Sequence, residues 1–160
     1  MTNVRDCFCN EMQNYYTHLA DRVRRGARAA GDDLWRNPFT YGNSVGHLVT
    51  HITGNLNHYI GARIARTGYQ RDRDREFTDI ARPTVDTLLA RFDEAMETVL
   101  VVLERLDEAQ LIADYPGDEH LEKTNLGVLV LCASHMNNHI GQMVYLLKAL
   151  KGAELDPPVW

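Results

Sequence analysis

Two pairs of histidines are the residues of this chain whose type and spacing could do chemistry. The stretch SHMNNHIGQ holds His135 and His139, and the stretch GHLVTH holds His47 and His51. Side chains four positions apart on a helix lie one turn apart on the same face, so two imidazole rings can reach one ion. A further histidine from a facing helix would complete three nitrogen ligands and leave a position open for water, as in catalytic zinc sites.

A structural explanation competes with metal binding at each pair. One pair at this spacing also arises by chance in a helix, and it is the presence of two pairs that favours a metal site. The pattern around His135 is not the HExxH of zinc proteases, because Met136 stands where the glutamate would be. His18 and His120 are interpreted as surface residues, and His58 as a hydrogen-bonded helix residue rather than a ligand.

Four residues near the second pair have simpler interpretations. Cys132, one turn before His135, is expected to be a buried structural thiol. Met136 and Met143 fall on the apolar face and are expected in the core. Gln142 is either a hydrogen-bonding partner of a ligand or part of the polar surface.

Helical periodicity of the apolar residues predicts the elements that must position these histidines. One helix is expected over residues 4–25, and a second from a cap at Asn43 or Ser44 to about Thr67. A third opens with Pro83 as its first residue and runs through VLERL, and a fourth runs from a cap at Thr124 to about Lys151. The sequence thus predicts an all-α fold, a four-helix bundle in a single domain spanning residues 1–160.

The connection between the second and third helices is expected to cross the bundle. It covers Gly68 to Arg82, roughly 15 residues, and neighbouring antiparallel helices typically need only about 2 to 8. Its stretch QRDRDREF has two interpretations. Alternating charges could form a solvated, self-paired loop. Alternatively, Arg71, Arg73 or Glu76 could lean over the mouth of the bundle, where an arginine would bind a substrate carboxylate.

Composition excludes several classes of partner and location. The net charge of −5 and the lack of a basic cluster beyond the short stretches RVRRGAR and RDRDR argue against nucleic acid as a partner. No apolar run reaches the roughly 18 to 20 residues of a membrane span, and the first residues do not look like a signal peptide. Cys7, Cys9 and Cys132 are interpreted as reduced thiols. These features predict a cytoplasmic protein.

The runs SVGHLVTHITGNLNHYIGARI, RDRDREF and SHMNNHIGQMVYLLKAL together resemble the DinB-like superfamily of metalloenzymes over about residues 40–150. The resemblance implies a four-helix bundle with a long crossover between helices two and three. It also implies a metal triad of one histidine from the second helix and an HxxxH pair from the fourth, here His51, His135 and His139. Relatives are often homodimers, so a homodimer is expected.

The position of His47 departs from that family pattern, which commonly has an apolar or aromatic residue there. His47 could line the site, compete with His51 as the ligand, or act as an auxiliary acid or base, and the last role is the one predicted. The metal is expected to be divalent, with zinc or nickel favoured by imidazole ligands. The superfamily includes transferases that use low-molecular-weight thiols, which implies thiol transfer to a small-molecule substrate. A metal-dependent hydrolase and a non-catalytic helical binding module are the alternatives.

Overall fold

The computed structural model describes residues 3–118 and 122–152, and the part of the chain that it describes is all-helical. The expected all-α class is confirmed. The long elements are α1 (Val4–Ala30), α2 (Val45–Leu56), α4 (Val85–Arg105) and α6 (Asn125–Lys151). The short ones are a 3₁₀ turn (Gly31–Asp33), a π-helix (Asn57–Ala62), α3 (Arg75–Thr78) and α5 (Glu108–Ile112). His120 lies outside the described residues.

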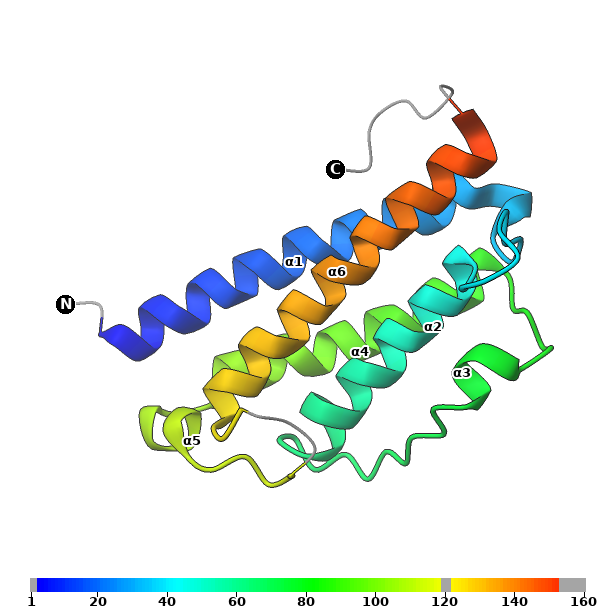
Figure 1. Ribbon diagram of the computed structural model, residues 1–160. Helices are drawn as coiled ribbons and strands as arrows, with labels where there is room; N and C mark the ends of the chain where they lie inside the picture. Colours follow the sequence, from blue (N-terminus) through cyan, green and yellow to red (C-terminus); the bar gives the residue numbers. More distant parts are fainter. Residues whose placement is uncertain (1–2, 119–121, 153–160) are drawn as a thin grey trace.

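The long helices pack side by side as a bundle. α1 contacts α6, α4 and α2, while α2 contacts α4 and α6. In Figure 1, α1 and α6 run in one direction and α2 and α4 in the other. Since α2 and α4 are parallel, the chain between them must travel back along the molecule, and α3 packs on α2 during this return. The long crossover expected from residues 68–82 therefore brings its charged side chains alongside α2.

Side-chain caps fix where three of the helices begin. The hydroxyls of Ser44, Thr84 and Thr124 each accept a hydrogen bond from the backbone N–H three residues later. The expected caps at Ser44 and Thr124 are confirmed. The expectation that Pro83 is the first helical residue is wrong, because Thr84 is the cap and Pro83 precedes it.

The other boundaries differ from the sequence prediction at points where the periodicity is weak. α1 continues to Ala30, five residues beyond the expected end, because its last turn still buries Gly26, Ala27 and Ala30. The α-helical part of the second helix ends at Leu56 and continues as a π-helix. The short helices α3 and α5 are additional to the four predicted helices, since four or five residues are too few to show an apolar period.

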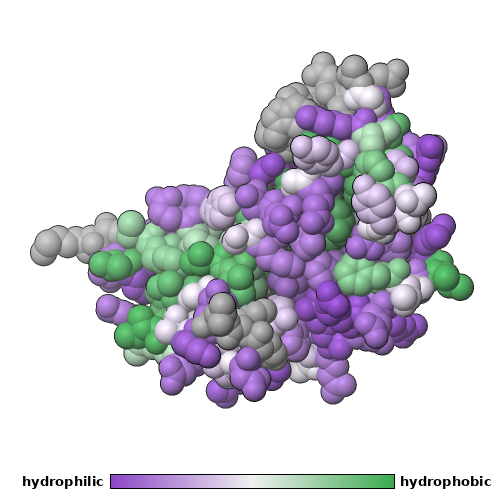
Figure 2. Space-filling model, in the orientation of Figure 1, coloured by the Kyte–Doolittle hydropathy of each residue, from purple (hydrophilic) through white to green (hydrophobic). Residues whose placement is uncertain are grey.

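The core lies between the long helices and includes the residues predicted for it. Met136 and Met143 are fully buried, and Cys132 is 1 % exposed, which confirms its expected burial. Figure 2 shows hydrophobic side chains gathered over the end of the molecule where α1 begins, whereas the middle of this face is mainly hydrophilic. Among the described helices, none is long and apolar enough to cross a membrane. The homodimer stays a prediction.

Candidate metal centre

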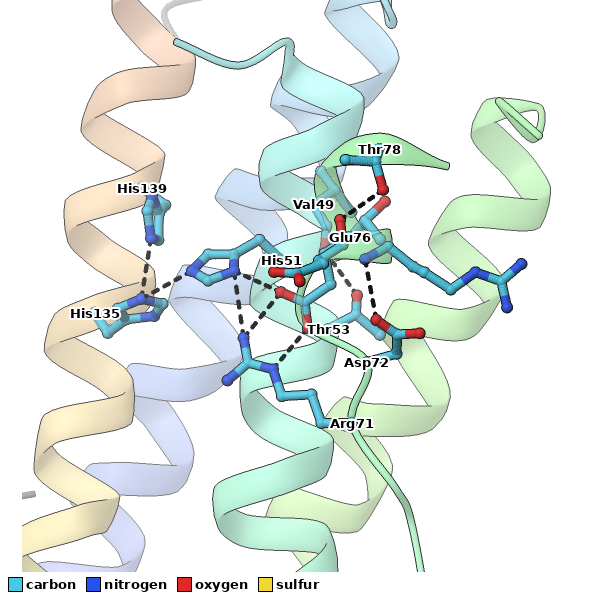
Figure 3. A network of polar contacts seen from close by, with 12 residues as sticks. Val49, His51, Thr53, Arg71, Asp72, Glu76, Thr78, His135 and His139 are labelled. Atoms are coloured by element: carbon cyan, nitrogen blue, oxygen red, sulfur yellow. Dashed lines mark hydrogen bonds and ion pairs between the residues drawn. The ribbon is translucent and has the colours of Figure 1, made fainter. Parts of the chain in front are cut away.

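His51, His135 and His139 come together between α2 and α6 and form a group that could hold a metal ion. Their rings point toward a common centre in Figure 3. The Nε2 atom of His135 lies 3.2 Å from Nε2 of His51 and 3.0 Å from Nε2 of His139. The α6 pair is adjacent because its members are one helical turn apart, and the packing of α2 on α6 adds His51.

These separations are the ones that a shared ion would require. Two nitrogens that each lie about 2.1 Å from one ion are about 3.0 Å apart for a right angle at the ion and about 3.4 Å apart for a tetrahedral angle. The observed 3.0 and 3.2 Å fall within that interval. Two of the three Nε2 separations therefore match neighbouring corners of a coordination sphere, and the ligand atoms of all three histidines lie within 4.8 Å of one another.

The hydrogen bonds on the far sides of the rings fix which nitrogens carry protons. His51 Nδ1 lies 2.7 Å from Glu76 Oε2, and His139 Nδ1 lies 2.9 Å from Gln142 Oε1. Both oxygens are acceptors, so each Nδ1 donates and each Nε2 presents a lone pair to the centre. A terminal nitrogen of Arg71 also lies 3.3 Å from His51 Nδ1, but its shorter contact, at 2.9 Å, is with Glu76 Oε2. Of the two roles considered for Gln142, the structure shows the first, a hydrogen-bonding partner of His139.

Hydrogen bonds alone cannot satisfy the contacts of His135 Nε2, whereas a cation at the centre could. His135 Nε2 faces the lone pairs of both other histidines and can donate a proton to only one of them. Its Nδ1 is buried and has no hydrogen-bond partner within the described residues. With a cation at the centre, all three Nε2 lone pairs would have a common partner, so the donor set fits a metal ion.

Burial keeps two of these imidazoles in the neutral form that binds metals. Burial, followed by the neighbouring His139 and His51, lowers the pKa of His135 from 6.5 to about 3. Burial also lowers the pKa of His139, and its contact with Gln142 only partly offsets this effect. Protons therefore compete weakly for these nitrogens at neutral pH.

Glu76 and Arg71 in the crossover form a hydrogen-bonded group on the outer nitrogen of His51. The Glu76 carboxylate accepts from Arg71 Nε at 2.6 Å and from an Arg71 terminal nitrogen at 2.9 Å, in addition to His51. The side chains of Arg71 and Glu76 are only 8 % and 5 % exposed. Burial alone would raise the pKa of Glu76, but the hydrogen bonds from His51 and Arg71 outweigh it and lower that pKa. The carboxylate thus stays ionised and orients the ring of His51.

The π-helix contributes to the same support. Its Tyr59 ring lies under the Arg71 guanidinium, 5.7 Å from the ring centroid. The backbone carbonyl of Tyr59 accepts a hydrogen bond from the Tyr115 hydroxyl at 3.2 Å. Phe77 packs on His51 with ring centroids 5.0 Å apart, and Arg73 lies over Phe77. The aromatic contacts on both sides hold the crossover against α2.

At Arg71 and Glu76 the structure agrees with the expected self-pairing of QRDRDREF but not with its solvation, and the binding of a substrate carboxylate stays a prediction. Arg71 and Glu76 are buried against the site, and they bind each other and His51 rather than solvent. Neither interpretation of this stretch predicted their supporting role. The available signal was a charge pair five residues apart in the connection that follows the His51 helix.

The structure places His47 in a different environment from the triad. Its Nδ1 lies 2.8 Å from the Ser44 hydroxyl, and the two residues form the capping box of α2. Its ring contacts the edge of Trp35, 5.3 Å between centroids. Burial, followed by the charge of Arg82, lowers the pKa of His47. Of the two histidines on α2, His51 is thus the one grouped with His135 and His139, and the acid or base role of His47 stays a prediction.

Replacing Gly54 by alanine is expected to weaken both the fold and the metal site. A Cβ at position 54 would lie 2.8 Å from the carboxyl carbon of Glu76 and closer still to its Oε1. Glu76 is held by Arg71 and His51 and cannot withdraw without breaking those bonds. Metal affinity should fall by about tenfold, as for other residues that orient a ligand, and isothermal titration would measure it.

Gly141→Ala is the matched control, because a Cβ there meets nothing within 4 Å. In the middle of α6, this substitution should stabilise the fold by about 0.5 to 1 kcal/mol and leave metal affinity unchanged. If Gly54→Ala and Gly141→Ala had equal effects on metal affinity, the position of Glu76 would not depend on the space beside Gly54.

Acidification is expected to destabilise the metal-free protein as the pH falls from 6.5 towards 3. In that interval the unfolded chain takes up a proton at His135, whose usual pKa is 6.5, while the folded chain does not until about 3. The free energy of unfolding therefore decreases with decreasing pH. Denaturant unfolding in the presence of a chelator at pH 7 and pH 4.5 would measure this loss. His135→Gln should reduce it, and an unchanged loss in that variant would assign the pH dependence to other groups.

The comparisons with known proteins identify a family without naming an activity. No curated protein and no solved structure matches the sequence. Residues 5–157 match a family described as a protein of unknown function, DUF1572. Since this match covers nearly the whole of the 160 residues, the chain belongs to the DUF1572 family.

Proposed function

We propose that this protein is a metal-dependent enzyme in which His51, His135 and His139 bind one divalent ion. The observation that carries the proposal is the convergence of three Nε2 atoms, two of them fixed as lone-pair donors by Glu76 and Gln142. Zinc or nickel is the preferred ion, because neutral imidazoles suit both.

Three histidine ligands are typical of a catalytic rather than a closed structural site. Structural zinc sites usually have four protein ligands, whereas catalytic sites keep a position for water or substrate. Among the described residues, no fourth histidine, cysteine or carboxylate joins the group of three. Glu76 is directed to the outer nitrogen of His51, and Arg71 binds both of its carboxylate oxygens.

The proposed reaction is transfer of a low-molecular-weight thiol to a small electrophile. A divalent ion on three imidazoles lowers the pKa of a bound thiol or water towards neutrality and so supplies the nucleophile. The sulfur would attack the electrophilic carbon, the leaving group would depart with the bonding electrons, and the thiol proton would pass to solvent. The preference for a thiol over water rests on the resemblance to the DinB-like superfamily, whose crossover topology also agrees with the parallel α2 and α4.

The proposal can be tested with protein purified without a histidine tag, then stripped of metal and reloaded with zinc or nickel. The assay follows glutathione with 1-chloro-2,4-dinitrobenzene for thiol transfer, and 4-nitrophenyl acetate for hydrolysis. The loaded protein should accelerate the first reaction, and both metal removal and His139→Ala should abolish the acceleration.

Three outcomes separate the alternatives. Acceleration of the ester reaction alone would favour the hydrolase over the thiol transferase. Tight metal binding without either activity, combined with unfolding of the metal-free chain, would indicate a structural ion. Wild-type protein that takes up no zinc or nickel would overturn the proposal.

A further inference from the structure

A pocket of about 590 Å³ lies between α6 and the loop that joins α1 to α2. Three aromatic side chains line it, although they are unusually exposed for their size: Phe39 at 43 %, Tyr41 at 75 % and Tyr145 at 76 %. Its volume is in the range of small-molecule sites, which are commonly lined by aromatic residues with a few polar groups. Here the polar groups are the amides of Asn138 and Gln142.

The aromatic wall on the loop is held in position by local hydrogen bonds. The Asn37 side chain accepts from the backbone N–H of Phe39 at 3.0 Å and donates to the carbonyl of Tyr41 at 2.9 Å. Between these anchors, the Phe39 and Tyr41 rings stack with centroids 5.8 Å apart and an interplanar angle of 16°. Gly42 follows with φ 81°, a conformation that glycine adopts without strain. The wall is therefore formed without a ligand, which lowers the cost of binding one.

Gln142 connects this pocket to the metal centre. The same side chain lines the pocket and holds the Nδ1 atom of His139. Leu48, on the floor of the pocket, lies on α2 one turn before His51. The His139 ring and the Gln142 side chain thus lie between the pocket and the centre on which the three Nε2 atoms converge. A molecule bound at that centre could extend into it.

We propose that this pocket binds an aromatic group of the substrate while the reactive end of the substrate lies at the three-histidine site. Tyr41 and Tyr145 offer ring surfaces for stacking, and the amides of Asn138 and Gln142 offer hydrogen bonds at its polar side. This inference rests on the proposed metal site, since it concerns the molecule that the site would act on. It assigns the substrate class as small aromatic compounds.

Gly141 provides a way to block the pocket without removing any contact. It lines the pocket, and a Cβ there meets nothing within 4 Å, so a larger side chain would occupy open space. Leucine is also a better helix former than glycine, so Gly141→Leu should fold at least as well as the wild type. Tyr41→Ala is the second variant, because Tyr41 is exposed and its loss leaves the core intact.

The experiment compares two metal-binding probes on zinc-loaded protein by isothermal titration. Acetohydroxamate can reach only the metal, whereas 3-phenylpropanohydroxamate carries a phenyl ring on a short linker. The phenyl compound should bind wild type about tenfold tighter, as expected for burial and stacking of one ring. Gly141→Leu and Tyr41→Ala should each reduce this preference to about twofold or less. Neither substitution should change the zinc content or the affinity for acetohydroxamate.

The outcomes distinguish failure of the pocket from failure of the metal site. Equal affinities of the two probes for wild type would overturn the pocket and leave the metal site standing. A tenfold preference that survives in both variants would also overturn it, because the phenyl group would then bind elsewhere. Protein that takes up no zinc would overturn the proposed function and this inference together.

Discussion

His135→Ala is expected to abolish metal binding, reducing the metal content from about one equivalent to none. His135 is the ring whose Nε2 lies within 3.2 Å of both other Nε2 atoms, so its removal leaves two ligands on different helices. Two imidazoles hold a divalent ion far more weakly than three, and the loss should exceed the roughly 10 to 100-fold effect of removing a supporting residue. Elemental analysis after dialysis would measure the content.

His51→Ala and His139→Ala should give the same result, and His47→Ala is the matched control. His47 lies on the same helix one turn from His51, but its ring contacts Ser44 and Trp35. Its loss should remove the capping box of α2, at a cost of about 1 kcal/mol, and leave the metal content unchanged. Loss of metal from the His47 variant, with retention in the His51 variant, would reverse the assignment of the α2 ligand.

Arg71→Ala is expected to destabilise the fold by about 3 kcal/mol, a large fraction of the stability of a domain of this size. The substitution leaves the Glu76 carboxylate buried, with His51 as its remaining side-chain partner. Glu76 would then take up a proton or move into solvent, and either change removes the acceptor that orients His51. Denaturant unfolding of the metal-free protein would measure the free energy, and metal titration should show weaker binding.

Two controls separate this effect from the loss of any ion pair. Arg24 and Asp93 form a pair of similar length, 2.9 Å, but their side chains are 34 % and 49 % exposed. Arg24→Ala should therefore cost about 1 kcal/mol or less. Replacing Arg71 and Glu76 together, by methionine and glutamine, should cost less than Arg71→Ala, because no unpaired charge stays buried. A double variant as unstable as the single one would assign the loss to packing of the arginine stem instead.

The pairing of His135 with His139 could be predicted from the sequence because it is a local property. The helical period places residues four apart on one face whatever surrounds them, and α6 keeps that geometry through both positions. The caps at Ser44 and Thr124 were predictable for the same reason, since each hydroxyl bonds a backbone group three residues away. The apolar spacing likewise determined the all-helical class and the burial of Met136 and Met143.

Two short irregular elements could not be predicted from the sequence, even though they are local structures. The π-helix at Asn57–Ala62 and the four-residue helix α3 are too short to show an apolar period. Their conformation depends on what they contact, namely Tyr115 and Arg71 for Tyr59, and α2 for the crossover helix. These two irregular elements nevertheless position the groups that support His51.

The resemblance to a known family, rather than spacing, indicated His51 in preference to His47. Both histidines belong to the same helix and satisfy the same period, and their separation did not distinguish a ligand from a capping residue. The tertiary structure distinguishes them, because α6 lies against the side of α2 that carries His51. The ring of His47 instead contacts Trp35 and Ser44. The role of Glu76 was decided in the same way, by a crossover that folds back on α2 and by Gly54, which leaves room for the carboxylate. The sequence by itself determined which side chains share a helix face, and only the packing of distant segments decided which of those faces meet.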